Sequence, residues 1–419
     1  MKALTRITLP FGRSRVAVEV PRANLLGIVE PRETAEVGQG AAQLGEALAQ
    51  PVGSPRLCEL ARPGQKVVII TSDLTRPCPS ATLLPPVLGE LAAAGVAEHN
   101  VTIVVALGLH RAMTAAELSA TVGPDVYRRL RVLNHDPADT IRLGVTSRGT
   151  PVEILRPVVE ADLRVCLGNL EFHYFVGYSG GAKAILPGCA SQATVTANHA
   201  MMVRPEATAG RLEGNPVRVD LEEGVALLGP TFILNVLVGD RGRVLGAVAG
   251  DVTAAHRQGC EMVAQRGKVA IPRRADIALV SAGGYPKDVN LYQAQKALDN
   301  AESAVRDGGI IILAAECPEG CGNRTFEEWM TGGDSPQALL ERIQKCFVLG
   351  GHKAAAIAKV AQRVRILLVS PALAGLRLAG LEHYPTVQAA LAAALEALGA
   401  EAQIIALPHG GSVLPQAPC

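Results

Sequence analysis

The feature that most constrains the fold is a repeated succession of short apolar runs and amphipathic stretches. From residue 65 the chain reads QKVVIITSD, continues through a helical stretch at about 79–94, and enters a second apolar run, VTIVVALG. Apolar runs of this length between helical stretches are typical of parallel strands flanked by helices. The sequence therefore predicts an α/β fold with mixed or mostly parallel sheets, whose ligand sites lie in loops beyond the carboxyl ends of the strands.

A second succession of the same kind further along the chain indicates a second α/β domain. It reads as the strand ADIALVSAGG, a helix at 291–305 and the strand GGIIILAAE, followed by the strands RILLVS and AQIIAL. The tetrapeptide IPRR at 271–274 is interpreted as a linker. We therefore expect an N-terminal domain at 1–270 and a C-terminal domain at 275–419, with the last residues of the chain able to pack back on the N-terminal domain.

Two segments alternate apolar and polar residues in the manner of β-hairpins. The first, ITLPFGRSRVAVEVP, turns near Gly12, and the second, FILNVLVGDRGRVLGAVAG, turns at about 239–242. Helices are expected between and after the polar loops, at 191–203 and at 254–265.

Charge and cysteine usage exclude several classes of partner. Lysine and arginine number 40 against 39 for aspartate and glutamate, so no global field draws the chain to nucleic acid or to an anionic membrane. No stretch reaches the roughly 18 apolar residues of a membrane span, and the N-terminus has no continuous apolar run of a signal peptide. Nine scattered cysteines argue against a secreted disulfide framework. We expect a cytoplasmic protein that holds any anionic ligand by local groups.

The segment with the clearest chemical character is 171–188, which reads EFHYFVGYSGGAKAILPG. Glycines at 177, 180 and 181 allow backbone conformations that bring N–H groups close to an anion such as a phosphate, and Lys183 stands beside them. Ala184 occupies the place where a P-loop needs a hydroxyl to hold magnesium. The segment thus predicts an anion site and disfavours an ordinary NTPase.

Polar side chains follow two of the predicted strands in the first domain. Asp73 and Arg76 follow the run VVIIT, and His110 follows the run VTIVVALG. An arginine offers a planar fork for a carboxylate or phosphate, and an aspartate accepts hydrogen bonds from ribose hydroxyls. Two alternatives stay open: Asp73 and Arg76 only fix a turn, and His110 is an incidental loop histidine.

Two more histidines lie in or beside the glycine-rich segment. His173 comes ten residues before Lys183, so the two are too close in sequence to be independent. His199 projects from the predicted helix that follows, where the alternative is a half-buried helical histidine without a chemical role.

In the second domain one helical turn carries a phenol, an amide and an ammonium group. Tyr292, Gln293 and Lys296 share a face of the predicted helix because positions three and four apart are neighbours on a helix surface. They could direct these groups at one ligand. The alternative is a solvated helix face.

Taken together, these segments resemble the nickel-dependent lactate racemase family. The match covers most of the chain, and its longest segment, 171–188, is highly specific, whereas the shorter ones are specific only in their order. The segments are SDLTRP at 72–77, GLHRAMT at 108–114, EFHYFVGYSGGAKAILPG at 171–188, NH at 198–199, GNPVR at 214–218 and LYQAQK at 291–296.

The resemblance implies a nickel-pincer nucleotide, a pyridinium-3-thioamide-5-thiocarboxylate mononucleotide that binds nickel through two sulfurs and a ring carbon. By this resemblance Lys183 is the covalent attachment point, and His199 is the protein ligand to nickel. Both residue types fit, since an amine can form a thioamide link and imidazole nitrogen suits nickel. Asp73 would hold the ribose, and the phosphate would be held by the turn formed by Gly177, Ser179, Gly180 and Gly181.

The resemblance also implies an activity, racemisation or epimerisation of a 2-hydroxy acid by reversible hydride transfer to the cofactor. His110 and His173 would serve as general acid and base on opposite faces of the substrate carbon, since a histidine pKa of about 6.5 allows both roles. Arg76 and Lys296 would clamp the substrate carboxylate, helped by Tyr292 and Gln293. The domain at 1–270 would bind cofactor and catalyse, and the domain at 275–419 would close over an active site in the cleft between them.

Substrate identity and the competing activities stay open at this point. Lactate, a larger aliphatic, aromatic or dicarboxylic acid, or a sugar acid would fit the same chemistry, and the partners would be this acid and the enzymes that build the cofactor. A nicotinamide-dependent 2-hydroxy acid dehydrogenase is an alternative, although no G-x-G-x-x-G motif follows a strand here. A non-catalytic nucleotide-binding protein is another.

Overall fold

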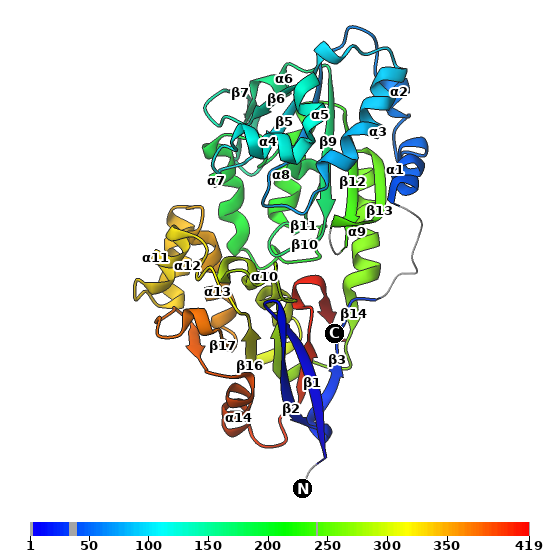
Figure 1. Ribbon diagram of the computed structural model, residues 1–419. Helices are drawn as coiled ribbons and strands as arrows, with labels where there is room; N and C mark the ends of the chain where they lie inside the picture. Colours follow the sequence, from blue (N-terminus) through cyan, green and yellow to red (C-terminus); the bar gives the residue numbers. More distant parts are fainter. Residues whose placement is uncertain (1–2, 33–39, 240–241, 419) are drawn as a thin grey trace. The chain divides into compact units, whose positions relative to one another are not determined.

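The computed structural model describes residues 3–32, 40–239 and 242–418 as two compact units. One unit comprises residues 34–264, and the other combines residues 1–33 with 265–419. Both are α/β structures in which parallel strands form the centre of a six-stranded sheet, which confirms the predicted fold class (Figure 1).

The unit at 34–264 has a sheet with the strand order β13-β12-β9-β4-β5-β6. All neighbouring pairs are parallel except β12 with β13, which form the predicted antiparallel hairpin. The tip of this hairpin, at 240–241, lies outside the described residues. The strands are β4 (Val67–Ser72), β5 (Val101–Ala106), β6 (Arg131–Asn134), β9 (Leu163–Leu170), β12 (Thr231–Val238) and β13 (Val244–Asp251), and a separate pair consists of β7 (Thr140–Val145) and β8 (Pro151–Leu155).

Helices flank this sheet, and one face of it carries an extended apolar cluster. Alternate strand residues such as Ile69, Ile103 and Val165 pack there against Leu83 and Leu91 of α3. The helices of the unit are α1 (Gly40–Ala49), α2 (Leu57–Leu60), α3 (Ser80–Ala93), α4 (Ala115–Val122), α5 (Pro124–Arg129), α6 (Arg156–Val159), α7 (Gln192–Ala200), α8 (Pro216–Ala226) and α9 (Ala254–Gly267).

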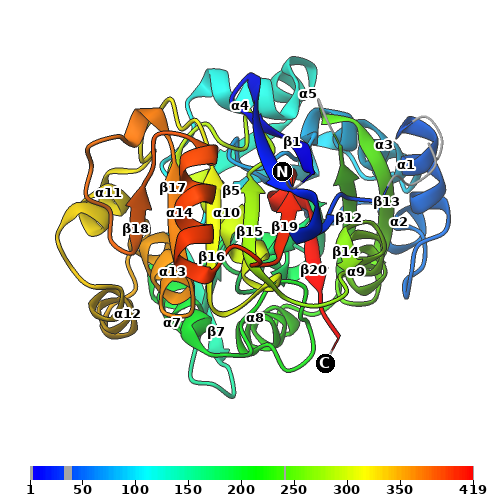
Figure 2. The ribbon, with the colours of Figure 1, turned by 90° about the horizontal axis from the view of Figure 1, so that it is seen from below.

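The other unit has a sheet with the strand order β18-β17-β16-β15-β19-β3, and all its neighbouring pairs are parallel. Figure 2 shows β17, β16, β15 and β19 side by side in this order. The strands are β3 (Leu25–Ile28), β15 (Ala275–Ser281), β16 (Val305–Ala314), β17 (Arg365–Val369), β18 (Leu381–His383) and β19 (Ile404–Leu407), and the helices are α10 (Leu291–Glu302), α11 (Arg324–Thr331), α12 (Pro336–Lys345), α13 (Gly351–Ala361) and α14 (Val387–Leu398).

The N-terminal hairpin belongs to this second unit, which corrects the expected domain division. β1 (Leu4–Phe11) and β2 (Ser14–Pro21) pair antiparallel around the predicted turn, and their buried side chains pack against β15, β16 and α14. The hairpin was expected within a domain at 1–270, but its pattern of buried residues says only that one face is covered and not by which element.

The chain end pairs with residues 268–270 of the expected domain at 1–270, but in the structure these residues belong to the second unit. β20 (Leu414–Gln416) pairs in parallel with β14 (Lys268–Ala270), and both strands lie in the second unit. The predicted linker at 271–274 begins at a buried residue, Ile271, whose N–H donates to Gln416 O at 2.9 Å. The last residues are therefore part of the second unit rather than of the N-terminal domain.

Over the described parts of the chain, none of the helices combines the length and the apolar character that a bilayer crossing requires.

The packing of the hairpin predicts that substitutions on its buried face lower the stability of the protein much more than substitutions on its exposed face. Leu9 of β1 is fully buried in the cluster with Ile277 and Leu279 of β15, whereas its neighbour Thr8 faces solvent. Leu9→Ala should lower the free energy of unfolding by about 2–5 kcal/mol, because it removes buried methyl groups and leaves a cavity. Thr8→Ala should change it by less than about 0.5 kcal/mol. Urea denaturation of the full chain measures both, and equal effects of the two variants would contradict the packing of this hairpin.

Candidate functional site

The strand order of the 34–264 unit brings three predicted site loops to one edge of the sheet. β9, β4 and β5 are parallel neighbours, and their carboxyl ends lead into segment 171–188, into Asp73 and into the loop of His110. A hydrogen bond from Gly108 N to Gly188 O at 2.9 Å ties the loop of His110 to the end of the segment. The predicted gathering of sites beyond the strand ends is therefore present in this unit.

Segment 171–188 follows β9 as two very short strands and a 3-10 turn. β10 (Phe172–His173) pairs with β11 (Gly177–Tyr178), and residues Gly181–Ala184 form the turn that carries Lys183. Two of its glycines are needed for close packing as well as for their positive φ of 82° and 60°. A Cβ at Gly177 would lie 2.0 Å from Arg211 O, and a Cβ at Gly181 would lie 2.7 Å from the ring of His256.

Some polar groups of the segment already have partners inside the protein. The N–H of Gly181 donates to Asn235 Oδ1 at 2.7 Å, so this N–H is not left for an anion in this conformation. Ser179 is buried, and its hydroxyl donates to Asn169 O at 2.8 Å and accepts from Glu171 N at 2.9 Å. Both residues were expected to contact the cofactor phosphate, and here both bond to neighbouring protein groups.

Asp73 and His110 form an ionisable pair of the site. His110 Nδ1 lies 2.7 Å from Asp73 Oδ2, and the other carboxylate oxygen accepts from Thr75 N at 3.2 Å and from Thr75 Oγ1 at 2.7 Å. The Asp73 side chain is 5% exposed and the His110 side chain 31% exposed. The carboxylate is thus directed at His110 and Thr75, and its predicted contact with a ribose stays a prediction.

The balance of effects keeps Asp73 ionised. Burial raises the pKa of this carboxyl, but the hydrogen bond and charge of His110, the Thr75 hydroxyl and the charge of Arg76 together hold the pKa below its usual range. An ionised carboxylate only accepts hydrogen bonds, so His110 Nδ1 must carry the proton. In the neutral His110 ring the lone pair is then on Nε2.

A buried relay fixes the ring of His199 in the same way. Asn198 Nδ2 donates to Val217 O at 3.1 Å and to Asp220 Oδ2 at 2.8 Å, which leaves the amide oxygen facing His199. Asn198 Oδ1 lies 3.0 Å from His199 Nδ1, so Nδ1 is the donor and Nε2 carries the lone pair. Asp220 is held in turn by the hydroxyls of Thr146 and Thr150, at 2.5 Å and 2.8 Å.

Burial and two positive charges keep the His199 ring neutral. Burial, which is the larger effect, and the charges of Lys183 and Arg76 together lower the pKa of His199 to about 3. A neutral imidazole with a defined lone pair is the form that binds metals. The half-buried histidine considered from the sequence is therefore a fully packed one with a fixed tautomer.

His173 joins this group through an aromatic contact. The ring of Phe175 lies 4.7 Å from the ring of His173 and 5.0 Å from that of His199, edge-on to both. The N–H of Val176 donates to His173 Nδ1 at 3.4 Å. The unit at 34–264 therefore brings together the predicted residues Asp73, Arg76, His110, His173, Lys183 and His199.

The remaining predicted residues lie in the second unit, on one half-buried face of α10. Tyr292, Gln293 and Lys296 are neighbours there, as their spacing predicts. The Tyr292 ring packs edge-on against Phe326 at 5.7 Å and against His352 at 6.1 Å. Packing on these rings distinguishes this face from the solvated face that the sequence left open.

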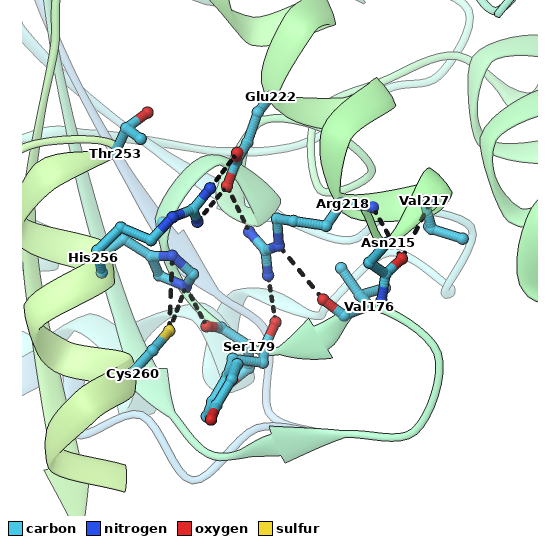
Figure 3. Close-up of polar contacts among 12 residues, drawn as sticks. Val176, Ser179, Asn215, Val217, Arg218, Glu222, Thr253, His256 and Cys260 are labelled. Atoms are coloured by element: carbon cyan, nitrogen blue, oxygen red, sulfur yellow. Dashed lines mark hydrogen bonds and ion pairs between the residues drawn. The ribbon is translucent and has the colours of Figure 1, made fainter. Parts of the chain in front are cut away.

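The sequence did not single out the residues that form hydrogen bonds with the backbone of segment 171–188. Arg218, Asn215 and His256 donate hydrogen bonds to its backbone carbonyls, as Figure 3 shows for Arg218 and His256. Asn215 and Arg218 belong to the GNPVR segment, to which the sequence gave no role. His256 has no local motif, because its partner is 77 residues away in the chain.

Comparison with known proteins gives matches over most of the chain. Residues 11–210 match the family described as "Lactate racemase N-terminal domain", and residues 271–414 match "Lactate racemase C-terminal domain". A curated lactate racemase from Thermoanaerobacterium thermosaccharolyticum is 37% identical over 351 residues, 81% of each chain. A curated lactate racemase from Lactiplantibacillus plantarum is 33% identical over 347 residues, again 81% of each chain.

Solved structures agree with the sequence matches. The structure of the lactate racemase apoprotein from T. thermosaccharolyticum gives a TM-score of 0.89 at 33% identity, over 98% of this chain and 100% of that chain. A protein from Thermotoga maritima gives a TM-score of 0.61 at 18% identity, over 90% of this chain and 97% of its own, and it shows the fold alone.

The relay behind His199 predicts its state in the protein without added metal. In apoprotein labelled with ¹⁵N-histidine, His199 should be the Nδ1–H tautomer and should stay neutral until the pH falls to about 3. Asn198→Leu removes the acceptor at Nδ1 and should shift the ring towards the other tautomer. Long-range ¹H–¹⁵N spectra report both, with the exposed His99 as the reference for a ring in water. An Nε2–H tautomer in the unaltered protein would contradict the relay.

Proposed function

Because the chain belongs to the lactate racemase family, it is an isomerase of the racemase type, and we propose that it inverts the configuration of a 2-hydroxy acid such as lactate. The observation that carries the proposal is the Asp73–His110 pair at 2.7 Å, in the unit where Arg76, Lys183, His173 and His199 also gather. Racemisation needs a base, an acid and an anion-holding group in one place, and this set contains all three.

We propose that Lys183 and His199 hold a nickel-pincer nucleotide, Lys183 through a covalent bond and His199 through Nε2. A neutral imidazole nitrogen is a suitable ligand for nickel, and burial keeps this ring neutral. Within the described ranges no three His, Cys, Asp or Glu side chains stand close enough to hold a metal, so a cofactor that brings most of its own donors suits this protein. When bound, this cofactor would supply reversible uptake of hydride from the substrate carbon.

His110 is suited to take the proton of the substrate hydroxyl. Its Nδ1–H is held by Asp73, so Nε2 presents the lone pair, and its side chain is 31% exposed and can be reached by a ligand. When Nε2 accepts a proton, the ionised Asp73 beside the ring stabilises the imidazolium. Asp73 thus acts through His110.

His173 carries its proton on the opposite nitrogen. Its Nδ1 accepts from the N–H of Val176, so in the neutral ring the proton is on Nε2. In the neutral rings Nε2 is therefore a proton acceptor at His110 and a hydrogen-bond donor at His173, and either ring acts as a general acid only after it has become the imidazolium. Because the two faces of a planar keto acid are served in turn, the imidazole on each face would take the hydroxyl proton as a base and return it as an acid.

The positive groups of the site suit an acid substrate. We propose that Arg76 binds the substrate carboxylate, since its charge already acts on both Asp73 and His199. We also propose that Lys296, Tyr292 and Gln293 of α10 complete the binding of the acid. The side-chain class of the acid depends on residues around the substituent and stays open among lactate, larger aliphatic, aromatic, dicarboxylic and sugar acids.

The proposal is tested on protein produced together with the enzymes that build the cofactor. Nickel content is measured first, and single enantiomers of 2-hydroxy acids from each class are then incubated with the protein while chiral chromatography follows the antipode. Appearance of the antipode without added NAD supports the proposal. Nickel-loaded protein that converts no acid of the panel would refute it, and a lasting absorbance change with NAD would favour a dehydrogenase.

The role of Lys183 gives a prediction that does not depend on turnover. Protein made with the cofactor-building enzymes should show an added mass on the polypeptide, and Lys183→Ala should show the bare polypeptide because the attaching amine is gone. Lys345→Ala, which removes an exposed amine of α12, is the matched control and should keep the added mass. Intact-mass spectrometry measures all three, and an adduct that survives in Lys183→Ala would contradict the assignment.

Substitution of Asp73 distinguishes two roles for this carboxylate, support of His110 and binding of the cofactor. If it serves His110, Asp73→Asn should keep the adduct mass and lower kcat by about 10- to 100-fold, the usual value of a hydrogen bond to a charged group. His110→Gln should lower kcat by about 10²- to 10⁴-fold. Thr75→Val, which removes a hydroxyl 2.7 Å from the other carboxylate oxygen, should have a smaller effect than either. Loss of the adduct in Asp73→Asn would instead indicate a cofactor-binding carboxylate.

A further inference from the structure

We propose that Arg218 is a positioning residue that fixes the backbone at 175–179 and thereby aims His173 and Lys183. It is a fully buried cation of α8 whose donors reach two carbonyls of this backbone. The inference rests on the proposed function only for the roles of His173 and Lys183, and the contacts that carry it stand without that function.

Five consecutive backbone carbonyls of the segment accept hydrogen bonds from protein donors. Arg218 Nε donates to Val176 O at 3.3 Å, and Arg218 Nη2 donates to Tyr178 O. The other three carbonyls accept from Asn215 Nδ2 at 3.0 Å, from Gly210 N at 2.9 Å and from His256 Nε2 at 2.8 Å, at residues Phe175, Gly177 and Ser179 in that order. The whole carbonyl side of this short stretch is thereby fixed.

Arg218 makes its two carbonyl contacts with two different nitrogens of one planar group. Val176 O and Tyr178 O lie two residues apart, and the planar fork of arginine presents N–H groups in two directions, whereas an ammonium is a single point charge. Burying this charge is costly, and burial lowers the pKa of Arg218 to about 10. Its partner Glu222 lies 3.6 Å from Nη1, and Glu222 is also bound by both guanidinium nitrogens of Arg257, at 2.8 Å and 2.7 Å (Figure 3).

His256 of α9 completes the support at the end of the stretch. A carbonyl only accepts, so Nε2 carries the proton on the way to Ser179 O, and burial together with the charge of Arg218 holds the pKa of this ring well below its usual range. The neutral ring is packed against Gly181, two residues before Lys183. Arg218 and His256 therefore both contact the backbone that leads into the turn from which Lys183 projects.

The supported stretch is directly continuous with both chemical groups. His173 pairs with Gly177 across β10 and β11, so its backbone is bonded to the supported stretch, and Lys183 follows that stretch by four residues. A displacement of about 1 Å at a reacting group can cost about 100-fold in rate. An apolar side chain at 218 would fill space but could not orient these carbonyls, so the position calls for arginine.

The test compares local hydrogen exchange in three variants of the full chain. Arg218→Met keeps the volume, removes the fork, and leaves Glu222 bonded to Arg257. It should speed amide exchange in peptides that cover 172–183 by about tenfold or more, because two carbonyls lose their charged donor. Arg257→Met is the matched control, since it removes a cation from the same network without touching a carbonyl of the segment, and its exchange at 172–183 should be unchanged.

Arg218→Lys keeps the positive charge but removes the planar guanidinium, and it tests the positioning role if Arg218→Met does not fold. It should loosen the same peptides, whereas peptides of β4, β5 and β9 stay protected. Uniform acceleration across these strands in both variants, or none at 172–183, would overturn the proposal and leave Arg218 a general stabiliser.

A second measurement follows the adduct on Lys183 by intact mass during production with the cofactor-building enzymes. If the adduct forms more slowly in Arg218→Lys than in Arg257→Met, the result supports the proposal that Arg218 positions Lys183. Equal adduct formation despite local loosening would overturn it. Absence of an adduct in the unaltered protein would count against the proposed function, while the exchange result would still decide the role of Arg218 in fixing the backbone.

Discussion

The site depends on the parallel order of β9, β4 and β5. Each strand ends at the same edge of the sheet, so segment 171–188, Asp73 and the loop of His110 begin as neighbours although they are far apart in sequence. If β4 ran antiparallel to its neighbours, Asp73 would start from the opposite edge and could not reach His110. The bond from Gly108 N to Gly188 O then fixes the outer ends of two of these loops to each other.

Within this arrangement, the hydrogen-bond partner of Nδ1 determines which nitrogen of each neutral imidazole carries the proton. A carboxylate at His110 and an amide oxygen at His199 require a proton there, whereas the N–H of Val176 at His173 requires a lone pair. In the neutral rings Nε2 therefore carries a lone pair at His110 and His199 but a proton at His173. Residue type alone therefore says little about what a histidine can do.

This is also the limit of what the sequence could predict. The strands, the helices, the hairpin turn at Gly12 and the site loops follow from local patterns, because periodicity and turn residues act over a few positions. The partners of Asp73, Gly181 and the N-terminal hairpin come from distant parts of the chain, and no local pattern encodes them. The ribose contact expected of Asp73 stays a prediction, and the protein groups that the fold brings to this carboxylate are those of His110 and Thr75.

The unit at 34–264 contains two kinds of buried interaction. One face of its sheet packs apolar side chains against α3 and its neighbours, and hydrophobic burial holds it together without preferring a direction. Beneath the glycine-rich segment, in contrast, lie the fully buried Arg218, His256 and Asp220, each bonded to named atoms of the site or its support. Hydrogen bonds weaken steeply with misalignment, so they can fix a backbone where apolar packing would let it slide. Buried polar groups therefore occur next to the backbone whose orientation the proposed chemistry requires, although burying them lowers stability.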